Sequence, residues 1–160
     1  MHLDYTEALF MKRALLSTMQ PRRENQKTEI GMKYMLMMNT MRAGSTGLSG
    51  WSEKDVRTMI GFMMDLDKEL RESGELVFEE GLTFPNEAKL VRADKNGVPI
   101  TDGVFPESKE FLAGFWIVDV ASPERAYAIA ARISMCPGPG GAPLYMPIEV
   151  RPVGSPPPTK

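Results

Sequence analysis

The sequence predicts an α+β domain in which a mainly antiparallel sheet carries its helices on one face. Short apolar segments of strand length alternate with two longer segments whose apolar residues recur every three or four positions. The pair Asn96-Gly97 divides a further segment as a hairpin turn would. The resulting order is strand, helix, strand, hairpin, strand, helix, strand. This order gives two βαβ-type halves with an insertion, which is the split arrangement of the ferredoxin-like fold.

The first half begins with a strand at residues 33–39, "KYMLMMN", which is apolar on both faces and suits a central position in the sheet. A helix follows Ser52, whose side chain can cap it together with Asp55 in a capping box. Gly74 ends that helix, since glycine adopts the left-handed cap at little cost. Its buried stripe consists of Val56, Met59, Ile60, Met63, Leu66 and Leu70. Two ion pairs are expected on its outer face, Glu53–Arg57 and Asp67–Arg71.

Two strands and a hairpin follow the first helix. Residues 75–82 form a strand, and residues 88–101 form a hairpin whose two-residue turn is Asn96-Gly97. Residues 112–120, "LAGFWIVDV", are rich in aromatic and β-branched residues and form the clearest strand.

A second helix and a last strand complete the domain. Ser122 caps the helix, and Pro123 occupies its first position, where the missing N–H costs nothing. The buried stripe of this helix is Ala126, Ile129, Ala130 and Ile133. Residues 144–153 form the last strand, which Pro147 places at an edge or a bulge of the sheet.

The composition is typical of a single globular domain, with 160 residues of which 42% are hydrophobic and 25% charged. A net charge of −2 gives no electrostatic reason to bind nucleic acid or an anionic membrane. The single cysteine, Cys136, excludes an internal disulfide and fits a reducing compartment. No apolar stretch approaches the roughly 20 residues of a membrane helix, and charged residues interrupt the start of the chain. We therefore expect a cytoplasmic protein without nucleic-acid or membrane partners.

The chain divides into three parts. Residues 1–31 form an extension that is weakly helical or flexible, and residues 32–153 form the compact domain. Residues 154–160 form a tail rich in proline, which lacks the donors and the side chains of a core element.

The expected sheet has a bare face, because both helices lie on the other side. It would expose side chains such as Met35 or Met37, Phe115 or Trp116, and Met146 or Ile148. A patch of that size on a monomer marks an interface, and twofold symmetry is the commonest way to cover it. We expect a homodimer whose sheets pack into a shared barrel. The nearby methionines are core residues or, alternatively, line a promiscuous apolar pocket: Met35, Met37, Met38, Met59, Met63 and Met64.

Several segments, taken in order, resemble the YCII-related, or DGPF, family. They are "MKYMLMMN" at 32–39, "EGL" at 80–82, "TDGVF…ESKE" at 101–110, "LAGFWIVDV" at 112–120, "A…AARI" at 126–133 and "IEVRPV" at 148–153. The resemblance covers residues 32–153 and implies a ferredoxin-like fold that dimerises as an α/β barrel. The family motif is Asp-Gly-Pro-Phe, and this chain has Val104 where proline is usual.

The resemblance implies two kinds of role. Members of the wider group resemble muconolactone-isomerase-like and dehydrochlorinase proteins, whose proposed machinery is a His–Asp dyad. The only histidine of this chain, His2, lies in the extension, so that dyad is not carried over. The DGPF branch is often encoded beside alternative sigma factors, which implies a regulatory or accessory role.

Asp102 and Glu80 are the candidate catalytic carboxylates, and each has a structural alternative. Asp102 either bonds its own turn backbone, as Asp-Gly does, or lies at the lip of a pocket as a base or ligand anchor. Glu80 alternates with Glu79 along a strand, so only one of the two faces a pocket. The alternative for Glu80 is an ion pair or a solvated edge.

Phe105, Lys109 and Arg132 are the candidate ligand-binding residues. Phe105 belongs to the same motif as Asp102, and Lys109 either neutralises a carboxylate ligand or lies on the surface. Arg132 either binds an anion or complements the dipole of the second helix. Cys136 is a packing residue, since no histidine lies nearby to activate it. No motif predicts a metal ion or a cofactor.

Three hypotheses for the function stay open. The first is a homodimer that binds a small apolar or carboxylate-bearing ligand near "TDGVF". The second is a lyase or isomerase, similar to a dehydrochlorinase, in which Asp102 or Glu80 transfers a proton and has a pKa raised by burial. The third is an accessory module that binds a protein partner in transcription control. Whether Asp102 and Glu80 converge in one pocket separates the enzyme from the others.

Overall fold

A computed structural model describes residues 31–41, 48, 50–83, 85–103 and 110–154 of the chain. The elements of these residues are β1 (Met32–Met41), α2 (Glu53–Glu72), β2 (Leu76–Gly81), β3 (Leu90–Ala93), β4 (Pro99–Asp102), β5 (Glu110–Val120), α3 (Pro123–Ser134) and β6 (Ile148–Pro152). Two short 3-10 helices, η1 (Pro85–Glu87) and η2 (Pro139–Gly141), lie in connecting segments. The predicted order of strands and helices is confirmed. The predicted extension at 1–31 lies almost wholly outside the described residues.

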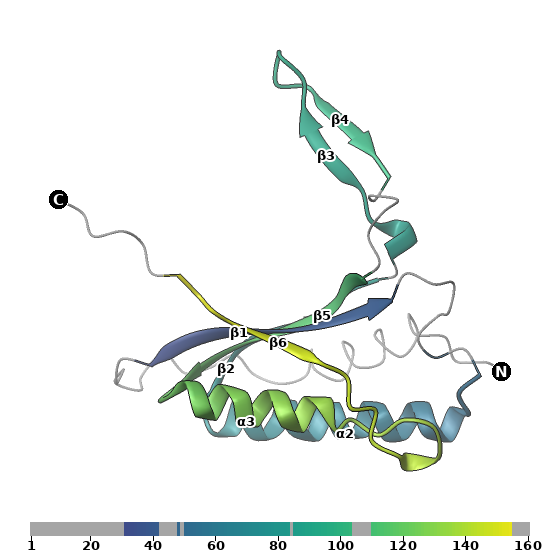
Figure 1. The fold of residues 1–160 in the computed structure, drawn as a ribbon, viewed down its shortest axis with the longest axis vertical. Coiled ribbons are helices and arrows are strands. Elements are labelled where there is room, and N and C mark those ends of the chain that lie inside the picture. The colour runs from purple at the N-terminus through teal and green to yellow at the C-terminus, as the bar shows by residue number, and fades with distance from the viewer. Residues whose placement is uncertain (1–30, 42–47, 49, 84, 104–109, 155–160) are drawn as a thin grey trace.

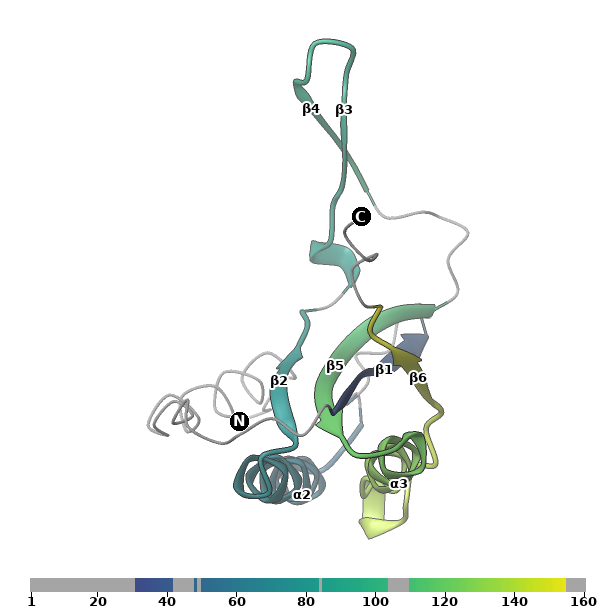
Figure 2. The same cartoon turned by 90° about the vertical axis from the view of Figure 1, so that its left-hand side faces the viewer.

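The main sheet has the strand order β2-β5-β1-β6, and each neighbouring pair is antiparallel. Both helices pack on one face of this sheet (Figures 1 and 2). This is the predicted α+β, ferredoxin-like architecture. Within the described residues the sheet is open, with β2 and β6 at its edges.

The two helices begin where local capping chemistry predicts. Ser52 Oγ accepts the N–H of Asp55 at 3.1 Å, and the N–H of Ser52 donates to the Asp55 carboxylate at 3.4 Å, which completes the capping box. Gly74 has a φ of 77° directly after the last turn of α2, as a left-handed cap requires. Ser122 caps α3 through the N–H of Arg125 at 3.4 Å.

The core lies between the helices and the sheet. The strands contribute every second side chain, and α3 contributes its whole predicted stripe. Of the stripe predicted for α2, Val56, Leu66 and Leu70 are buried, whereas Met59, Ile60 and Met63 are partly exposed. The buried residues that form the hydrophobic cluster are Tyr34, Leu36, Leu66, Leu70, Leu76, Trp116, Val118, Val120, Ala126, Ile129, Ala130 and Ile133. Met38, Met63, Ile148 and Val150 pack against them.

Strands β3 and β4 form a separate two-stranded sheet that projects from the domain. We call residues 88–102 the arm. Figures 1 and 2 show the arm on the side of the main sheet that faces away from the helices. Its turn differs from the predicted two-residue turn, because only Gly97 has a positive φ. Asp94 is the reason: its Oδ1 accepts the N–H groups of Asn96 at 2.7 Å and Val98 at 2.9 Å, which stabilises a three-residue loop.

The last strand is shorter than predicted. It begins at Ile148, and residues 137 and 143 before it form an isolated bridge. Tyr145, with a φ of 51°, and Pro147 lie in the segment that precedes the strand. Pro147 therefore costs the ladder no hydrogen bond.

Candidate functional site

The main sheet has an apolar face that neither described helix covers. The register places Met35 opposite Ile117 and Met37 opposite Phe115, and cross-strand neighbours project to the same side. Their sequence neighbours Leu36 and Trp116 enter the core. Met35, Met37, Phe115 and Ile117 therefore point away from the helices. Phe78 of β2 joins them: its ring centroid lies 5.9 Å from that of Phe115, and it is 48% exposed. We call Met35, Met37, Phe78, Phe115 and Ile117 the sheet face.

The prediction of which residues are exposed on this side is partly confirmed. Met35, Met37 and Phe115 lie on the sheet face. Trp116 is buried against the helices, and Ile148 packs on the core, because the register of β1 with β5 and β6 turns both inward. Met146 precedes β6.

Charged side chains surround the sheet face. Lys33 lies opposite Asp119 at one end of β1 and β5. On β6, Arg151 is paired with Met35 and Glu149 with Met37 in the register, and Arg151 Nε lies 3.8 Å from Glu149 Oε1. Positive and negative side chains both lie on this border, so the border is neither strongly positive nor strongly negative.

Glu80 reaches the sheet face, whereas Glu79 enters the protein. Glu80 is paired with Phe115 in the register and lies on the β2 edge of the face. Glu79 is only 8% exposed, and its Oε1 accepts from Arg71 Nη2 at 3.0 Å. The two glutamates therefore divide between the two faces of the sheet, as their alternation requires, and Glu80 is the one on the sheet face.

Asp102 lies at the end of β4, on the arm, and is exposed. Its Oδ2 lies 3.6 Å from Arg92 Nη2 on the facing strand. Among the described residues, no hydrogen bond or ion pair joins Asp102 to Glu80. Their role as catalytic carboxylates stays a prediction.

Phe105 and Lys109 lie outside the described residues, as does Val104. The predicted contribution of this part of "TDGVF" to a pocket therefore stays a prediction. The described chain resumes at Glu110, where β5 begins.

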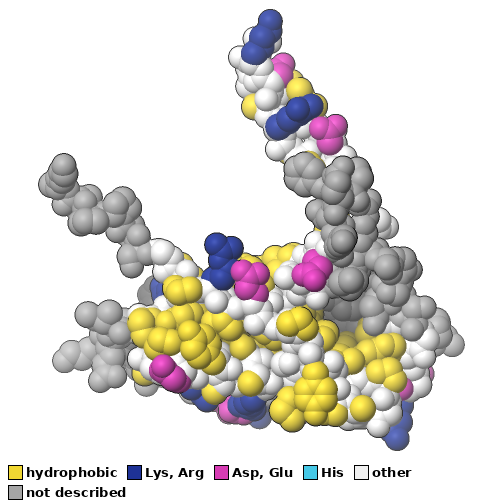
Figure 3. Space-filling model, viewed as in Figure 1, with side chains coloured by type: hydrophobic (Ala, Val, Ile, Leu, Met, Phe, Trp, Pro, Cys, Tyr) yellow, Lys and Arg dark blue, Asp and Glu magenta, His cyan; other side chains and the backbone are white. Residues whose placement is uncertain are grey.

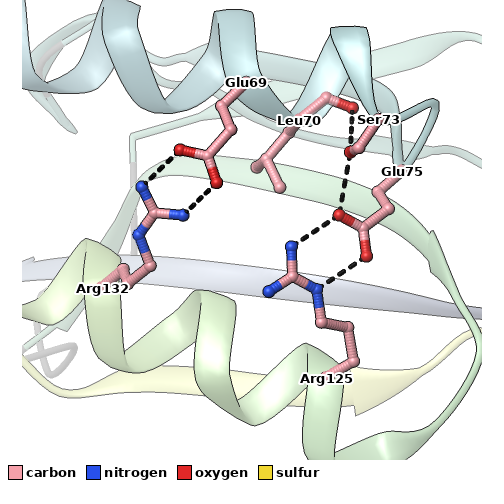
Figure 4. A network of polar contacts seen from close by, with 6 residues as sticks. All are labelled: Glu69, Leu70, Ser73, Glu75, Arg125 and Arg132. Carbon is pink, nitrogen blue, oxygen red and sulfur yellow. Dashed lines mark hydrogen bonds and ion pairs between the residues drawn. The ribbon is translucent and has the colours of Figure 1, made fainter.

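Arg132 lies on the helix side of the sheet and binds Glu69 of α2. Its two terminal nitrogens donate to the two carboxylate oxygens at 2.6 and 2.8 Å (Figure 4). The Arg132 hydrogen bond lowers the pKa of Glu69, and Glu69 in turn raises the pKa of Arg132. This bidentate geometry gives Arg132 a partner within the chain.

A second bidentate contact, about two turns earlier on α3, links that helix to the segment between α2 and β2. Arg125 donates to both carboxylate oxygens of Glu75 at 2.7 Å, and the Ser73 hydroxyl lies 2.9 Å from Glu75 Oε2 (Figure 4). The hydrogen bond from Arg125 lowers the pKa of Glu75 despite its partial burial. The Arg132 pair joins α3 to α2, and the Arg125 pair joins α3 to the connection between α2 and β2.

Asp67 is a buried carboxylate that sequence reasoning placed wrongly. It was expected on the outer face of α2 beside Arg71, but it is 0% exposed and accepts the indole N–H of Trp116 at 2.9 Å. Arg71 pairs with Glu79 instead. The signal was present in the helical spacing, since Asp67 lies four residues after Met63 and three before Leu70 on the buried stripe. The other predicted pair, Glu53–Arg57, is confirmed.

Cys136 is a packing residue with a protonated thiol. It is 1% exposed, and burial raises its pKa to about 11. In the described part of the chain, no group of three or more His, Cys, Asp and Glu side chains is placed to hold a metal ion. No helix in that part is long and apolar enough to cross a membrane.

Comparison with known proteins agrees with the geometry. A search of curated proteins finds no significant match. The sequence matches the YCII-related domain over residues 32–138, from the first residue of β1 to the segment after α3. Because this match covers more than half of the chain, the protein belongs to the YCII-related domain family.

Proposed function

We propose that this YCII-related domain forms a homodimer through the sheet face and binds a small apolar ligand between the two copies. The observation that carries the proposal is the sheet face itself. Methionine and aromatic side chains gather there, away from the helices that cover the other side. Large exposed apolar patches on small domains are usual at interfaces and binding sites.

The side chains of the sheet face suit a ligand with an apolar body. Met35 and Met37 are unbranched and polarizable, so they adapt to different ligand shapes. Phe115 and Phe78 offer rigid ring surfaces that lose little conformational entropy on binding. Apolar walls with a few polar groups at the margin are characteristic of small-molecule sites.

A carboxylate-bearing ligand is a more specific form of the same proposal. Lys33 and Arg151 lie at the border of the sheet face, and their side chains project to the same side of the sheet as Met35. An arginine can bind a carboxylate through two parallel hydrogen bonds. We place this ligand near the "TDGVF" segment, with Phe105 and Lys109 as its candidate contacts.

Enzymatic proton transfer is the second candidate function. Glu80 favours it, because its position on the β2 edge places a carboxylate beside Phe115 on the sheet face. A positioned carboxylate can act as a general base when its pKa suits the reaction. If this holds, Glu80→Gln abolishes turnover of a bound ligand while its binding is retained.

The accessory role in transcription control is the third candidate, and a protein partner would occupy the same exposed surface. The lone buried Cys136 is consistent with a reducing compartment, so we propose that the dimer acts in the cytoplasm.

Light scattering tests the dimer. The wild-type chain at micromolar concentration should give twice its mass of 17.8 kDa. Met37→Lys, on the sheet face, should give a monomer, since it places an unpaired charge in the interface. Tyr127→Lys is the matched control, because Tyr127 is 54% exposed on α3 and should leave the dimer intact. A wild-type monomer would overturn the proposal.

A thermal-shift screen against a panel of metabolites tests ligand binding. A ligand at about 100 times its dissociation constant stabilises a protein by about 2.7 kcal/mol. Stabilisation seen in the wild type and Tyr127→Lys, but absent in Met37→Lys, would support a site on the sheet face. Stabilisation that persists in Met37→Lys would place the ligand elsewhere.

A further inference from the structure

One face of the two-stranded arm is uncharged and exposed to solvent. Val91 lies opposite Thr101, and Ala93 opposite Pro99, so these four side chains share one face of the two-stranded sheet. All four are exposed, and Val91 is 63% exposed. Figure 3 shows hydrophobic side chains between charged ones along the projecting arm.

The other face of the two strands carries their two charged residues, Arg92 and Asp102. Arg92 lies opposite Ile100, and its guanidinium is 3.6 Å from the Asp102 carboxylate on the same face. Asp94 accepts two N–H groups of its own turn. Strands β3 and β4 therefore present one face with a pair of opposite charges and one face without charge.

A two-stranded hairpin of this size is marginally stable in water unless a further surface packs against it. Strands β3 and β4 have four residues each, and burying exposed side chains such as Val91 would remove apolar area from water. The uncharged face of the arm is thus suited to contact a protein surface.

The position of the arm identifies that surface. The arm projects on the same side of the main sheet as the sheet face, as two perpendicular views agree (Figures 1 and 2). A body that covers the sheet face therefore lies beside the arm. In the dimer proposed above, that body is the second copy.

The size of the sheet face also calls for additional contacts. The sheet face consists of five side chains from β1, β2 and β5, whereas a standard interface involves about 20–30 residues on each side. A standard stable interface buries about 800 Å² of accessible surface on each partner. Contacts made by the arm would increase the interface toward that size.

The geometry points to the arm as a clasp: the uncharged face formed by Val91, Ala93, Pro99 and Thr101 packs on a second copy of this chain. This inference rests on the proposed homodimer and names the element that completes its interface. By twofold symmetry each copy supplies one arm and receives one.

Matched lysine substitutions on the two faces of the arm test the clasp. Val91→Lys charges the uncharged face, and Ile100→Lys makes the same change on the opposite face, where the wild-type side chain is 39% exposed. Both positions are exposed, so both variants should fold, as circular dichroism will check. In analytical ultracentrifugation of the full chain, Val91→Lys should raise the dimer dissociation constant at least tenfold, and Ile100→Lys less than threefold.

The outcomes separate the clasp from the dimer. A wild-type dimer with an unchanged dissociation constant in Val91→Lys overturns the clasp and leaves the dimer standing. A wild-type monomer overturns both. A larger effect of Ile100→Lys than of Val91→Lys overturns the assignment of the contacting face.

Hydrogen exchange provides a second test. If the arm packs only within its own chain, its exchange rates should not depend on protein concentration. Backbone amides of residues 90–102 should exchange more slowly at protein concentrations above the dimer dissociation constant than below it. Protection that is independent of concentration would mean that the arm packs on its own chain, and it would overturn the clasp.

Discussion

Trp116 of β5 donates its indole N–H to Asp67 Oδ1 on α2 at 2.9 Å, with both residues almost entirely shielded from solvent. The bond joins the first helix to a central strand through the middle of the core. Buried polar groups in folded proteins are hydrogen-bonded, because an unmade bond leaves the full cost of desolvation. This pair is therefore a fixed point in the packing of α2 on the sheet.

Trp116→Phe should destabilise the protein by about 2–4 kcal/mol, since it removes the donor to a buried carboxylate and some packing volume. Asp67→Asn keeps an acceptor oxygen and should cost less. Urea unfolding of both variants and of the double variant measures the coupling between the two side chains. A coupling near zero would contradict an energetic role for the bond.

Features fixed by local chemistry could be predicted from the sequence. Ser52 with Asp55 marks the start of α2, and Gly74 its end, because each acts on backbone groups within one helical turn. The order of strands and helices followed from periodicity in the same way. The ferredoxin-like topology then followed from that order.

Features that depend on register or on distant partners could not be predicted. The sequence left Phe115 and Trp116 as alternatives for the exposed face, and the pairing of β5 with β1 decides between them. Glu79 enters the protein because Arg71 from α2 is placed to receive it. Helical spacing places Asp67 on the buried stripe, but its hydrogen-bond partner Trp116 lies 49 residues away in the chain. Long-range contacts of this kind leave little trace in local spacing.

The candidate site was predicted only in its broad position. Met35, Met37 and Phe115 belong to an apolar face that the helix count alone implied. The placement of Asp102 on the projecting arm has no such signal, because neither turn chemistry nor composition fixes the angle at which a hairpin leaves a sheet.

The two Arg–Glu pairs that α3 makes, with Glu69 on α2 and with Glu75 after α2, should make stability fall in acid. A carboxylate whose pKa is lower in the folded protein stabilises it above the unfolded-state pKa, and this stabilisation is lost as the pH falls through the folded value. For Glu69 and Glu75 the loss begins below the ordinary value of 4.5. Glu75→Gln should therefore show a shallower decline than the wild type between about pH 5 and pH 3 in urea unfolding.

Glu72→Gln is the control for that measurement. Glu72 is exposed at the end of α2 and lies 3.9 Å from Lys68, and none of the ion pairs among the described residues joins it to α3. Its unfolding midpoint should follow the wild-type dependence on pH. Parallel curves for Glu75→Gln and the wild type would show that the Arg125 pair does not contribute to acid sensitivity.

The thiol of Cys136 should be inert in the folded protein. Burial raises its pKa to about 11, so the reactive thiolate is scarce at neutral pH, and access is blocked as well. A disulfide reagent such as DTNB should react at least tenfold more slowly in buffer than in concentrated urea. Rapid modification in buffer would contradict the packing of α3 and the segment after it.

Two glycine-to-alanine substitutions should change stability in opposite directions. A Cβ at Gly114 on β5 would lie 3.1 Å from the carbonyl oxygen of Glu80 and 3.4 Å from the Cα of Gly81, so β2 would have to move. Gly114→Ala should therefore destabilise the protein by about 1–3 kcal/mol.

Gly61→Ala is the matched change in open space. A Cβ at Gly61, within α2, meets nothing within 4 Å, and glycine costs a helix interior about 1 kcal/mol relative to alanine. Gly61→Ala should thus stabilise the protein by about 0.5–1 kcal/mol. Thermal unfolding of both variants under the same conditions measures the two changes in stability. Both variants replace glycine by alanine, so a difference between them reflects the surroundings of the two positions. If Gly114→Ala were as stable as the wild type, the close approach of β2 to β5 would not constrain this position.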